Sequence, residues 1–428
     1  MDIKIIHNHF LKCKSISIDT RKIEADSFFV AIKGDNFDAN TFAKEALEKG
    51  ASFVIIDNHD YFIDERTIVV KDSLETLQEL ARYHRRYLNI PIIALTGSNG
   101  KTTTKELIQV VLAQKYKTKA TLGNLNNHIG VPLTLLSFDE NIEIGIVEMG
   151  ANHQKEIEFL CDIAQPNYGY ITNFGKAHLE GFGGVEGVIK GKCELYNYLL
   201  KHNKTVFVNL DDNIQVDKSF GIKSYTFGVN QPNADVFIES VTANPFVEIT
   251  FSNCKIVSNL IGLYNSNNIN AAITIGTFFQ VSIYDIKAAI QSFVPENNRS
   301  QLLNINSNEI ILDAYNANPS SMSVAIENFI QLNKSNKIAV LGDMFELGEE
   351  SLEEHKSIVN LLLNENTITT YFIGKDFYYN RMKRENFHFF ENFELFSEAF
   401  EKIKFINTII LIKGSRGMAL ERTLKLIG

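Results

Sequence analysis

A glycine-rich loop followed by a lysine and threonines is the segment of the sequence that points most directly to chemistry. It reads Thr96-Gly97-Ser98-Asn99-Gly100-Lys101-Thr102-Thr103-Thr104. In such a loop the glycines let backbone N–H groups converge on phosphate oxygens, the lysine neutralises the β- and γ-phosphates, and the first threonine hydroxyl binds Mg²⁺. We therefore predict a nucleotide phosphate site whose residues are Gly97, Ser98, Asn99, Gly100, Lys101, Thr102 and Thr103.

The spacing of this loop is shorter than the usual GxxxxGK[ST] pattern, because only Ser98 and Asn99 separate the two glycines. An ordinary strand-to-helix turn with a surface lysine is the alternative interpretation. The flanking residues favour the phosphate loop. The apolar run 92–95 predicts a buried strand before it, and Leu107, Val110 and Val111 predict one face of a helix after it.

A carboxylate at the end of a second apolar run is the first candidate metal ligand. Glu148 follows Ile144-Gly145-Ile146-Val147, so it is expected at the carboxyl edge of a parallel sheet, where α/β proteins bind ligands. We predict that Glu148 binds Mg²⁺ together with Thr102. The alternative is a carboxylate that caps a helix or stabilises a loop.

The elements that must position these residues follow an alternation of short apolar strands and amphipathic helices. Strands are expected at 92–96, 144–149, 168–172, 205–209, 338–341, 371–373 and 408–412. Helices are expected around Met322–Ile330 and Leu352–Leu362. The alternation predicts an α/β protein with largely parallel sheets. Residues 219–260 are rich in β-forming residues and are expected to leave the central sheet.

Length and composition agree with this organisation. The 428 residues suggest about three domains, and breaks near Pro91 and in 295–300 divide the chain into 1–88, 89–296 and 297–428. Lysine and arginine total 42 and aspartate and glutamate 51, a net charge of −9, so nucleic acid is not expected as a partner.

The remaining features of composition point to the cytoplasm. The four cysteines form no CxxC pair, which argues against a zinc site or a disulfide framework. No apolar stretch approaches the ~20 residues that span a bilayer, and the first residues lack the pattern of a signal peptide. We expect a cytoplasmic monomer with no membrane partner.

A series of further motifs accompanies the phosphate loop. The segments that carry them are 19–21, 26–31, 123–132 (GNLNNHIGVP), 147–153 (VEMGANH), 177–180, 191–194, 262–265, 313–319 (DAYNANP), 341–348 and 413–416. In this order they resemble the Mur ligase superfamily, and the DxYNANP element resembles its MurF branch. The resemblance implies a small N-terminal α/β domain, a central P-loop ATPase-like parallel sheet and a C-terminal Rossmann-like α/β domain.

The activity that the resemblance implies is ATP-dependent amide ligation in peptidoglycan precursor synthesis. A carboxylate of a UDP-muramyl-tripeptide would take the γ-phosphate of ATP, and the amine of D-alanyl-D-alanine would attack the resulting acyl phosphate. Residues 1–88 would bind the UDP end and 89–296 would bind ATP. Residues 297–428 would close over ATP and bind the dipeptide.

The resemblance also implies a second Mg²⁺ site. Its ligands would be His178 and Lys192, the latter carbamylated by CO₂, so that Lys101, His178 and Lys192 form the catalytic set. By residue type alone, a lone histidine such as His178 is more often a surface or hydrogen-bonded residue. Lys192 is one lysine among Lys190, Lys192 and Lys201, and the alternative for it is a solvated helix face.

Further binding residues follow from the same resemblance. Asn268 would bind adenine, while Arg299 and Asp313 would hold the ribose and orient the third domain. The residues implied for the UDP-muramyl-peptide are Thr20, Arg21, Ser27, Asn126, Asn127, Asn152 and His153. Those implied for the dipeptide and for closure are Asn316, Asn318 and Ser415.

Some positions depart from the family pattern. Residues 37–42 read FDANTF where the family tends to have FDGHxF, and Tyr264 stands where a histidine is usual. The alternatives are another ligase of the superfamily, which adds a single amino acid or glutamate to folate, a kinase, and a non-enzymatic P-loop nucleotide switch. The DAYNANP element and the uridine-type first segment argue against a folate ligase.

Overall fold

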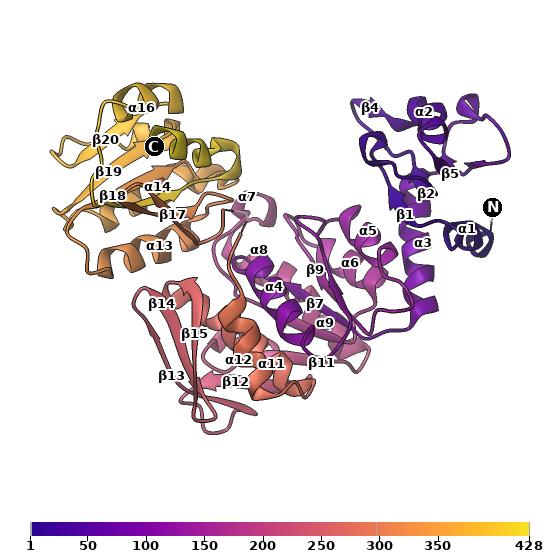
Figure 1. The fold of residues 1–428 in the computed structure, drawn as a ribbon, viewed down its shortest axis with the longest axis horizontal. Coiled ribbons are helices and arrows are strands. Elements are labelled where there is room, and N and C mark those ends of the chain that lie inside the picture. The colour runs from indigo at the N-terminus through magenta and orange to yellow at the C-terminus, as the bar shows by residue number, and fades with distance from the viewer. Residues whose placement is uncertain (1, 297, 428) are drawn as a thin grey trace.

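Three α/β domains are arranged as a V in the computed structural model, which describes residues 2–296 and 298–427 (Figure 1). The middle domain lies at the base of the V, and the N- and C-terminal domains form its two arms. Each domain is built around its own mainly parallel sheet. The predicted fold class is therefore confirmed.

The middle domain contains a nine-stranded sheet. Its strands in spatial order are β15 (Cys254–Ile261), β14 (Phe246–Phe251), β13 (Val236–Ala243), β12 (Lys223–Val229), β11 (Thr205–Asn209), β10 (Tyr168–Ile171), β7 (Ile92–Thr96), β9 (Ile144–Glu148) and β8 (Thr118–Ala120). Its helices are α4 (Lys101–Leu112), α5 (Gly130–Leu136), α6 (Glu156–Ala164), α7 (Leu179–Phe182), α8 (Val185–Lys192), α9 (Glu194–Lys201), α10 (Asn213–Lys218), α11 (Ser266–Phe278) and α12 (Ile283–Ser292).

Helices cover both faces of the parallel part of this sheet, and the sequence of its strands reflects that environment. Every residue of β7 and β9 is buried, as expected for parallel strands packed on both sides. The expectation that residues 219–260 leave the sheet was wrong. Strands β12 and β13 pair in parallel with the growing sheet, and β14 and β15 add antiparallel hairpins to the same edge.

The N-terminal domain has a four-stranded parallel sheet. Its strands in spatial order are β1 (Ser15–Ser17), β2 (Ser27–Val30), β5 (Ala51–Ile56) and β6 (Thr67–Val69), with a separate two-stranded ribbon of β3 (Lys33–Gly34) and β4 (Phe37–Asp38). Its helices are α1 (Ile3–Phe10), α2 (Ala43–Glu48) and α3 (Ser73–Leu88).

The C-terminal domain has a six-stranded sheet in which only the edge pair β16–β17 is antiparallel. The strands in spatial order are β16 (Gln301–Ile305), β17 (Asn308–Asp313), β21 (Ile409–Lys413), β18 (Lys337–Gly342), β19 (Ile368–Ile373) and β20 (Phe387–Phe390). The helices are α13 (Pro319–Gln331), α14 (Ser351–Leu361), α15 (Lys375–Tyr379) and α16 (Phe393–Phe400). The expected helices at 322–330 and 352–362 are confirmed as α13 and α14.

Helix α3 joins the N-terminal domain to the middle domain through buried polar groups. The Arg85 guanidinium donates to the carbonyls of Ala164 and Gln165 at the C-terminus of α6, at 2.9 and 3.1 Å. Such a cation satisfies helix-end carbonyls that have no intrahelical partner. His84 Nε2 lies 2.9 Å from the Phe138 carbonyl. This carbonyl can only accept, so His84 Nδ1 is an acceptor, and it receives a bond from His7 Nε2 of α1 at 3.0 Å.

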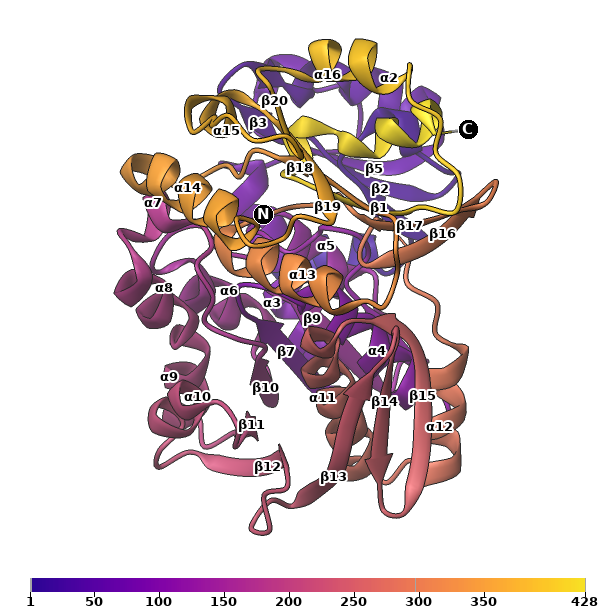
Figure 2. The ribbon, with the colours of Figure 1, turned by 90° about the vertical axis from the view of Figure 1, so that its left-hand side faces the viewer.

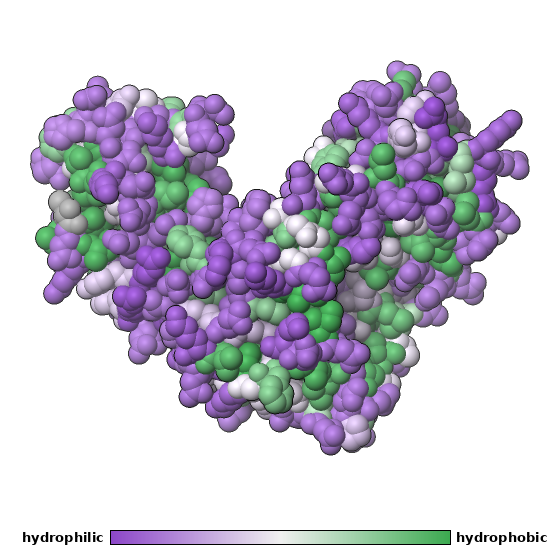
Figure 3. Space-filling view, turned by 180° about the vertical axis from the view of Figure 1, so that it is seen from behind, coloured by the Kyte–Doolittle hydropathy of each residue, from purple (hydrophilic) through white to green (hydrophobic). Residues whose placement is uncertain are grey.

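Figure 3 shows the two arms of the V from behind, with mainly hydrophilic residues at the surface and scattered apolar ones between them. Among residues 2–296 and 298–427, no helix combines the length and the apolar character needed to cross a bilayer.

The neutral histidine pair predicts a pH-dependent stability. Burial and the neighbouring His84 lower the pKa of His7 to about 4 from an ordinary value of 6.5, so between these values the unfolded chain binds more protons than the folded protein. The free energy of unfolding should therefore fall as the pH falls through this window, by up to about 1.4 kcal/mol per pH unit for one group.

Urea denaturation of wild type and His7→Gln at pH 7, 6, 5 and 4.5 measures this slope. Glutamine keeps an N–H donor for His84 without a titratable group, so the variant should lose stability less steeply on acidification. The exposed His59 provides the control, because His59→Gln should leave the slope unchanged. Equal slopes for His7→Gln and wild type would contradict the prediction.

Candidate active site

The phosphate loop connects β7 to α4 as the sequence predicts. Gly97 and Gly100 have φ values of 142° and 78°, a region that glycine reaches without strain. A Cβ on Gly100 would lie 2.5 Å from Oδ1 of the buried Asn268 on α11, and one on Gly97 would lie 2.0 Å from the Thr172 hydroxyl. Both positions therefore also need glycine because neighbouring groups approach the backbone closely.

The loop that follows β10 holds the phosphate loop in place. Asn173 donates from Nδ2 to the Asn99 carbonyl at 3.0 Å and accepts the Asn99 N–H at 3.1 Å. Thr172 donates its hydroxyl to the same carbonyl at 2.6 Å. These bonds fix both the N–H and the carbonyl of Asn99 to the loop after β10, so the conformation of the phosphate loop is set by its neighbour.

Lys101 begins α4 and lies across the loop. Its Nζ donates to the Gly97 carbonyl at 2.7 Å and to the Ser98 carbonyl at 3.3 Å. Burial lowers the pKa of Lys101, and the nearby Glu148 carboxylate acts in the opposite direction. A phosphate in the loop would attract this ammonium group away from the two carbonyls.

Glu148 ends β9 and is 1% exposed. Its Oε1 accepts a bond from Asn126 Nδ2 at 2.8 Å, while its Oε2 is buried and has no hydrogen-bond partner among the described residues. A buried carboxylate oxygen without a partner is costly unless a cation or donor binds it. This geometry fits the predicted Mg²⁺ ligand, because Mg²⁺ prefers oxygen ligands.

Lys192 is 1% exposed, so the solvated helix face that its sequence also allowed is excluded. Its Nζ donates to the Ala151 carbonyl at 3.2 Å, in the turn after Glu148, and lies 4.9 Å from the centre of the Phe182 ring. Burial lowers the pKa of Lys192 well below its ordinary value, and Lys101 adds to the effect. A neutral amine is the form that reacts with CO₂, so this environment fits carbamylation.

His178 lies between the middle and C-terminal domains. It adopts a left-handed backbone conformation, with φ 53°, immediately before α7. Its Nδ1 contacts a carboxylate oxygen of Glu346, which follows β18 in the C-terminal domain. This contact lowers the pKa of Glu346. The structure therefore supplies a carboxylate partner for the predicted metal-binding histidine.

Asn268 and Asp313, two of the predicted ATP-binding residues, are each fixed by hydrogen bonds to neighbouring side chains. Asn268 accepts from the Thr104 hydroxyl at 3.0 Å and donates to Asn265 at 2.8 Å, so its amide also fixes α11 to α4. Asp313 accepts from Lys413 Nζ at 2.6 Å.

Two tyrosines, Tyr315 and Tyr264, also lie at this junction. The Arg299 guanidinium stacks on the Tyr315 ring at 3.7 Å, and its Nε is buried without a partner among the described residues. Tyr264, which departs from the family pattern, shares a hydrogen bond of 2.9 Å with the Ser300 hydroxyl.

A cavity of about 1210 Å³ lies between the middle and C-terminal domains and brings most of the predicted residues together. The predicted residues in its wall are Ser98, Asn99, Gly100, Lys101, Thr102, Thr103, Asn126, Asn127, Glu148, Asn152, His178, Asn268, Arg299, Asp313, Asn316 and Asn318. The cavity therefore joins the phosphate loop, the candidate metal ligands and the first turn of α13.

Other predicted residues lie outside the cavity wall. Lys192 and Ser415 are buried behind it, with the Ser415 hydroxyl accepting the Phe345 N–H at 2.9 Å. His153 contacts Glu156 of its own turn at 3.3 Å. Thr20, Arg21 and Ser27 lie in the N-terminal domain, on the other arm of the V. Their predicted roles in UDP binding remain predictions.

Three residues of the wall lie in the motif segments named above but were given no role from the sequence. Glu346, Lys413 and Tyr315 contact His178, Asp313 and Arg299 respectively. Each follows or ends a C-terminal strand, and that position at the carboxyl edge of a sheet was a further signal.

Comparison with known proteins identifies this arrangement. Models of the Mur ligase middle domain, of the Mur ligase glutamate ligase domain and of the Mur ligase family catalytic domain match residues 95–276, 298–416 and 12–85. The UDP-N-acetylmuramoyl-tripeptide–D-alanyl-D-alanine ligase of Bacillus subtilis strain 168 is 33% identical, with 96% of this chain and 92% of the relative covered. The chain belongs to the Mur ligase family.

Solved structures of the family agree with the fold along the whole chain. A crystal structure of MurF from Acinetobacter baumannii gives a TM-score of 0.86 at 27% identity, covering 99% of this chain and 97% of that one. A MurF ligase from Thermotoga maritima in complex with ADP gives 0.83 at 26% identity, with 97% of both chains covered. The predicted resemblance to the MurF branch is thus confirmed.

The close approach of α11 to the phosphate loop predicts the effect of Gly100→Ala. The new methyl group would collide with Asn268, and a non-glycine residue at this φ adds about 1–2 kcal/mol of strain. Affinity for ADP, measured by isothermal titration calorimetry, should fall at least tenfold. Gly221→Ala is a matched control, since Gly221 has a φ of 80° and a Cβ added there would meet no atom within 4 Å. Unchanged ADP affinity in Gly100→Ala would contradict the prediction.

Proposed function

We propose that this chain is an ATP-dependent ligase that joins D-alanyl-D-alanine to UDP-N-acetylmuramoyl-tripeptide, with ADP and phosphate as the other products. The observation that carries the proposal is the cavity in which the phosphate loop, the partnerless Glu148 oxygen and residues of the C-terminal domain meet. The names of the full-length relatives support the same reaction. The substrates are small molecules, and the predicted cytoplasmic location and monomeric state remain predictions.

The physical problem of such a reaction is to bring a carboxylate to a polyphosphate. The two anions repel each other strongly in a cavity that excludes much of the water. The N–H groups of the phosphate loop, the N-terminus of α4 and the Lys101 ammonium provide positive charge on one side of the cavity. Positioning and charge neutralisation are the main contributions of the protein to phosphoryl transfer.

The proposal includes two Mg²⁺ ions, held by groups in the cavity wall and by the buried Lys192 beside it. Thr102 and Glu148 would hold the first, and His178 with carbamylated Lys192 would hold the second, and bound Mg²⁺ would supply neutralisation of phosphate charge. The Glu148 carboxylate is oriented by Asn126, so the loop that carries the candidate muramyl-peptide residues also fixes a candidate metal ligand.

The proposed reaction has two steps. An oxygen of the tripeptide carboxylate forms a bond to the γ-phosphorus as the bond to ADP breaks, which yields an acyl phosphate. The amine of D-alanyl-D-alanine then attacks the acyl carbon, loses a proton, and phosphate leaves. Asn316 and Asn318 lie in the wall contributed by the C-terminal domain, where the dipeptide would enter.

The requirement for both acceptors is the first test. Phosphate release from ATP should depend on UDP-muramyl-tripeptide and D-alanyl-D-alanine together, and mass spectrometry should find the UDP-muramyl-pentapeptide. Release that ignores either acceptor would overturn the ligase, and a stable phosphorylated acceptor would indicate a kinase instead.

Carbamylation of Lys192 is the second test. Lys192→Ala should lose at least about tenfold in kcat, because even residues that only support metal ligands typically contribute about 10–100-fold. A small added carboxylic acid should restore part of the activity. Mn²⁺ binding in the presence of ADP, followed by electron paramagnetic resonance, should show the same loss and rescue. Lys190 is an exposed lysine of the same helix, and the control variant Lys190→Ala should behave as wild type. Full activity of Lys192→Ala would exclude the carbamate.

A further inference from the structure

The loop between β10 and α7 contacts both the phosphate loop and the C-terminal domain. Thr172 and Asn173 hold Asn99 on its inner side, as described above. On its outer side the Lys176 N–H donates to the Ser320 hydroxyl of α13 at 2.8 Å. Lys176 Nζ forms an ion pair of 2.5 Å with Glu354 of α14. The turn Gly348–Glu350, which leads into α14, contacts α7, and Figure 2 shows α7 and α14 on this side of the molecule.

A direct contact with the phosphate loop accompanies this ion pair. Asn318 Nδ2, at the N-cap of α13, donates to Asn99 Oδ1 at 2.7 Å. The other side-chain atom of Asn318 accepts the Ser321 N–H and caps the helix. The position of α13 relative to the phosphate loop therefore depends on how firmly the C-terminal domain is held.

Glu354 is connected to the cavity through its neighbour on α14. His355 is fully buried, and its Nε2 accepts the Met344 N–H at 3.0 Å while its Nδ1 lies 2.7 Å from the Ser351 carbonyl. Met344 precedes Phe345 and Glu346, which line the cavity. A displacement of α14 would thus displace the segment that brings Glu346 to His178.

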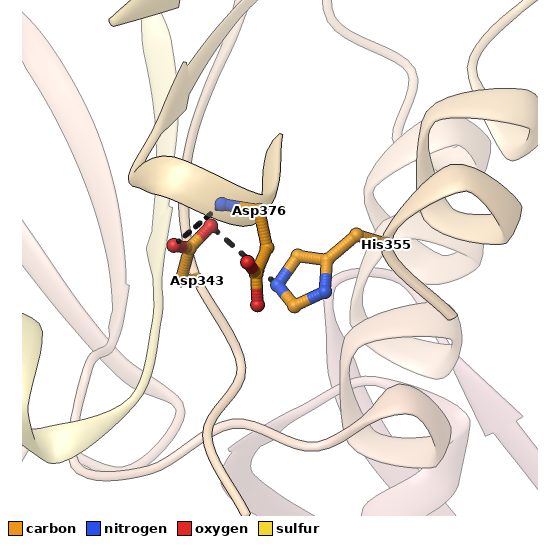
Figure 4. Close-up of side chains that lie close together, drawn as sticks. All are labelled: Asp343, His355 and Asp376. Atoms are coloured by element: carbon orange, nitrogen blue, oxygen red, sulfur yellow. Dashed lines mark hydrogen bonds and ion pairs between the residues drawn. The ribbon is translucent and has the colours of Figure 1, made fainter. Parts of the chain in front are cut away.

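Asp343 and Asp376 lie beside His355, and their hydrogen bonds argue for a structural role of this group and against metal binding. Figure 4 shows His355 beside Asp343 and Asp376, a grouping that resembles a metal site. Asp343, however, accepts the backbone N–H groups of Asp376 and Phe377 at 3.1 and 3.0 Å. The acceptor nitrogen of His355 is occupied by Met344, so the group fixes the loop after β18 to α14 and α15.

We propose that Lys176 and Glu354 are positioning residues that hold the C-terminal domain over the phosphate loop for the dipeptide-dependent step. The inference rests on the proposed ligase function. The side chains are 45% and 12% exposed, and neither lines the cavity, so they act through Asn318 and Glu346 and not on substrate. The pair orients the acceptor side of the cavity relative to bound ATP.

Charge reversal provides the test. Lys176→Glu should lower kcat/KM for D-alanyl-D-alanine by about fivefold to tenfold, as expected for loss of a partly exposed ion pair and its replacement by like charges. The double variant Lys176→Glu/Glu354→Lys should recover most of the loss. The deficit of the single variant should shrink as the salt concentration rises, because salt screens the charges involved.

Hydrogen exchange gives a readout that does not depend on the identity of the acceptor. With ADP bound, amides of 173–178 and 351–356 should exchange faster in Lys176→Glu and return to wild-type rates in the double variant. Lys334→Glu is the matched control, since Lys334 pairs with Glu309 at 2.6 Å within the C-terminal domain, and it should change neither measurement.

The outcomes separate the two proposals. Unchanged kinetics and exchange in Lys176→Glu, or a double variant no better than the single ones, would overturn the positioning role. A wild-type protein that needs no dipeptide for phosphate release would overturn the ligase function instead, while the exchange data would still decide whether the ion pair holds the domains together.

Discussion

Electrostatic repulsion between a polyphosphate and an incoming carboxylate is the constraint on which the rest of the structure depends. Backbone dipoles can reduce this repulsion, because Gly97 and Gly100 allow the chain between β7 and α4 to curl around an anion. The hydroxyl group of Thr172 and the amide group of Asn173 bind the Asn99 carbonyl and hold this conformation. Asn268 lies close to Gly100.

The surrounding groups make sense in relation to this loop. Glu148 ends β9 and Lys192 ends α8, and both are buried. Glu148 Oε2 has no hydrogen-bond partner among the described residues, and Lys192 Nζ donates to the Ala151 carbonyl. Burying such groups costs free energy of folding, and a bound ligand that supplied the missing partners would offset this cost. The C-terminal domain contributes Arg299, Asn318 and Glu346 from its strand ends and from the start of α13, which makes the site dependent on the relative position of two domains.

Much of this could be predicted from the sequence, because the signals are local. A buried parallel strand is a continuous apolar run, and the residue that ends it lies at the edge where ligands bind; Glu148 and the phosphate loop followed from that rule. The pairings that complete the site are not local. Glu346 and His178 lie 168 positions apart, and Lys176 and Glu354 lie 178 apart. The burial of Lys192 was invisible as well, because α8 carries lysines on more than one face, and the hairpins at 236–261 gave no sign of joining the central sheet.

Helix α3 belongs to the first segment of the sequence but packs into the middle domain. A break near residue 88 suggests that the first segment is an independent unit, yet Arg85 satisfies carbonyls of α6 and His84 bonds to Phe138. A fragment that ends at 88 would carry an arginine with no acceptors. A fragment that begins at 89 would expose helix-end carbonyls and the apolar residues of α5 and α6 that pack against α3. A chimera of two relatives, or a truncated protein made for crystallisation, would therefore fold only if α3 and the surface of the middle domain that contacts it come from the same protein.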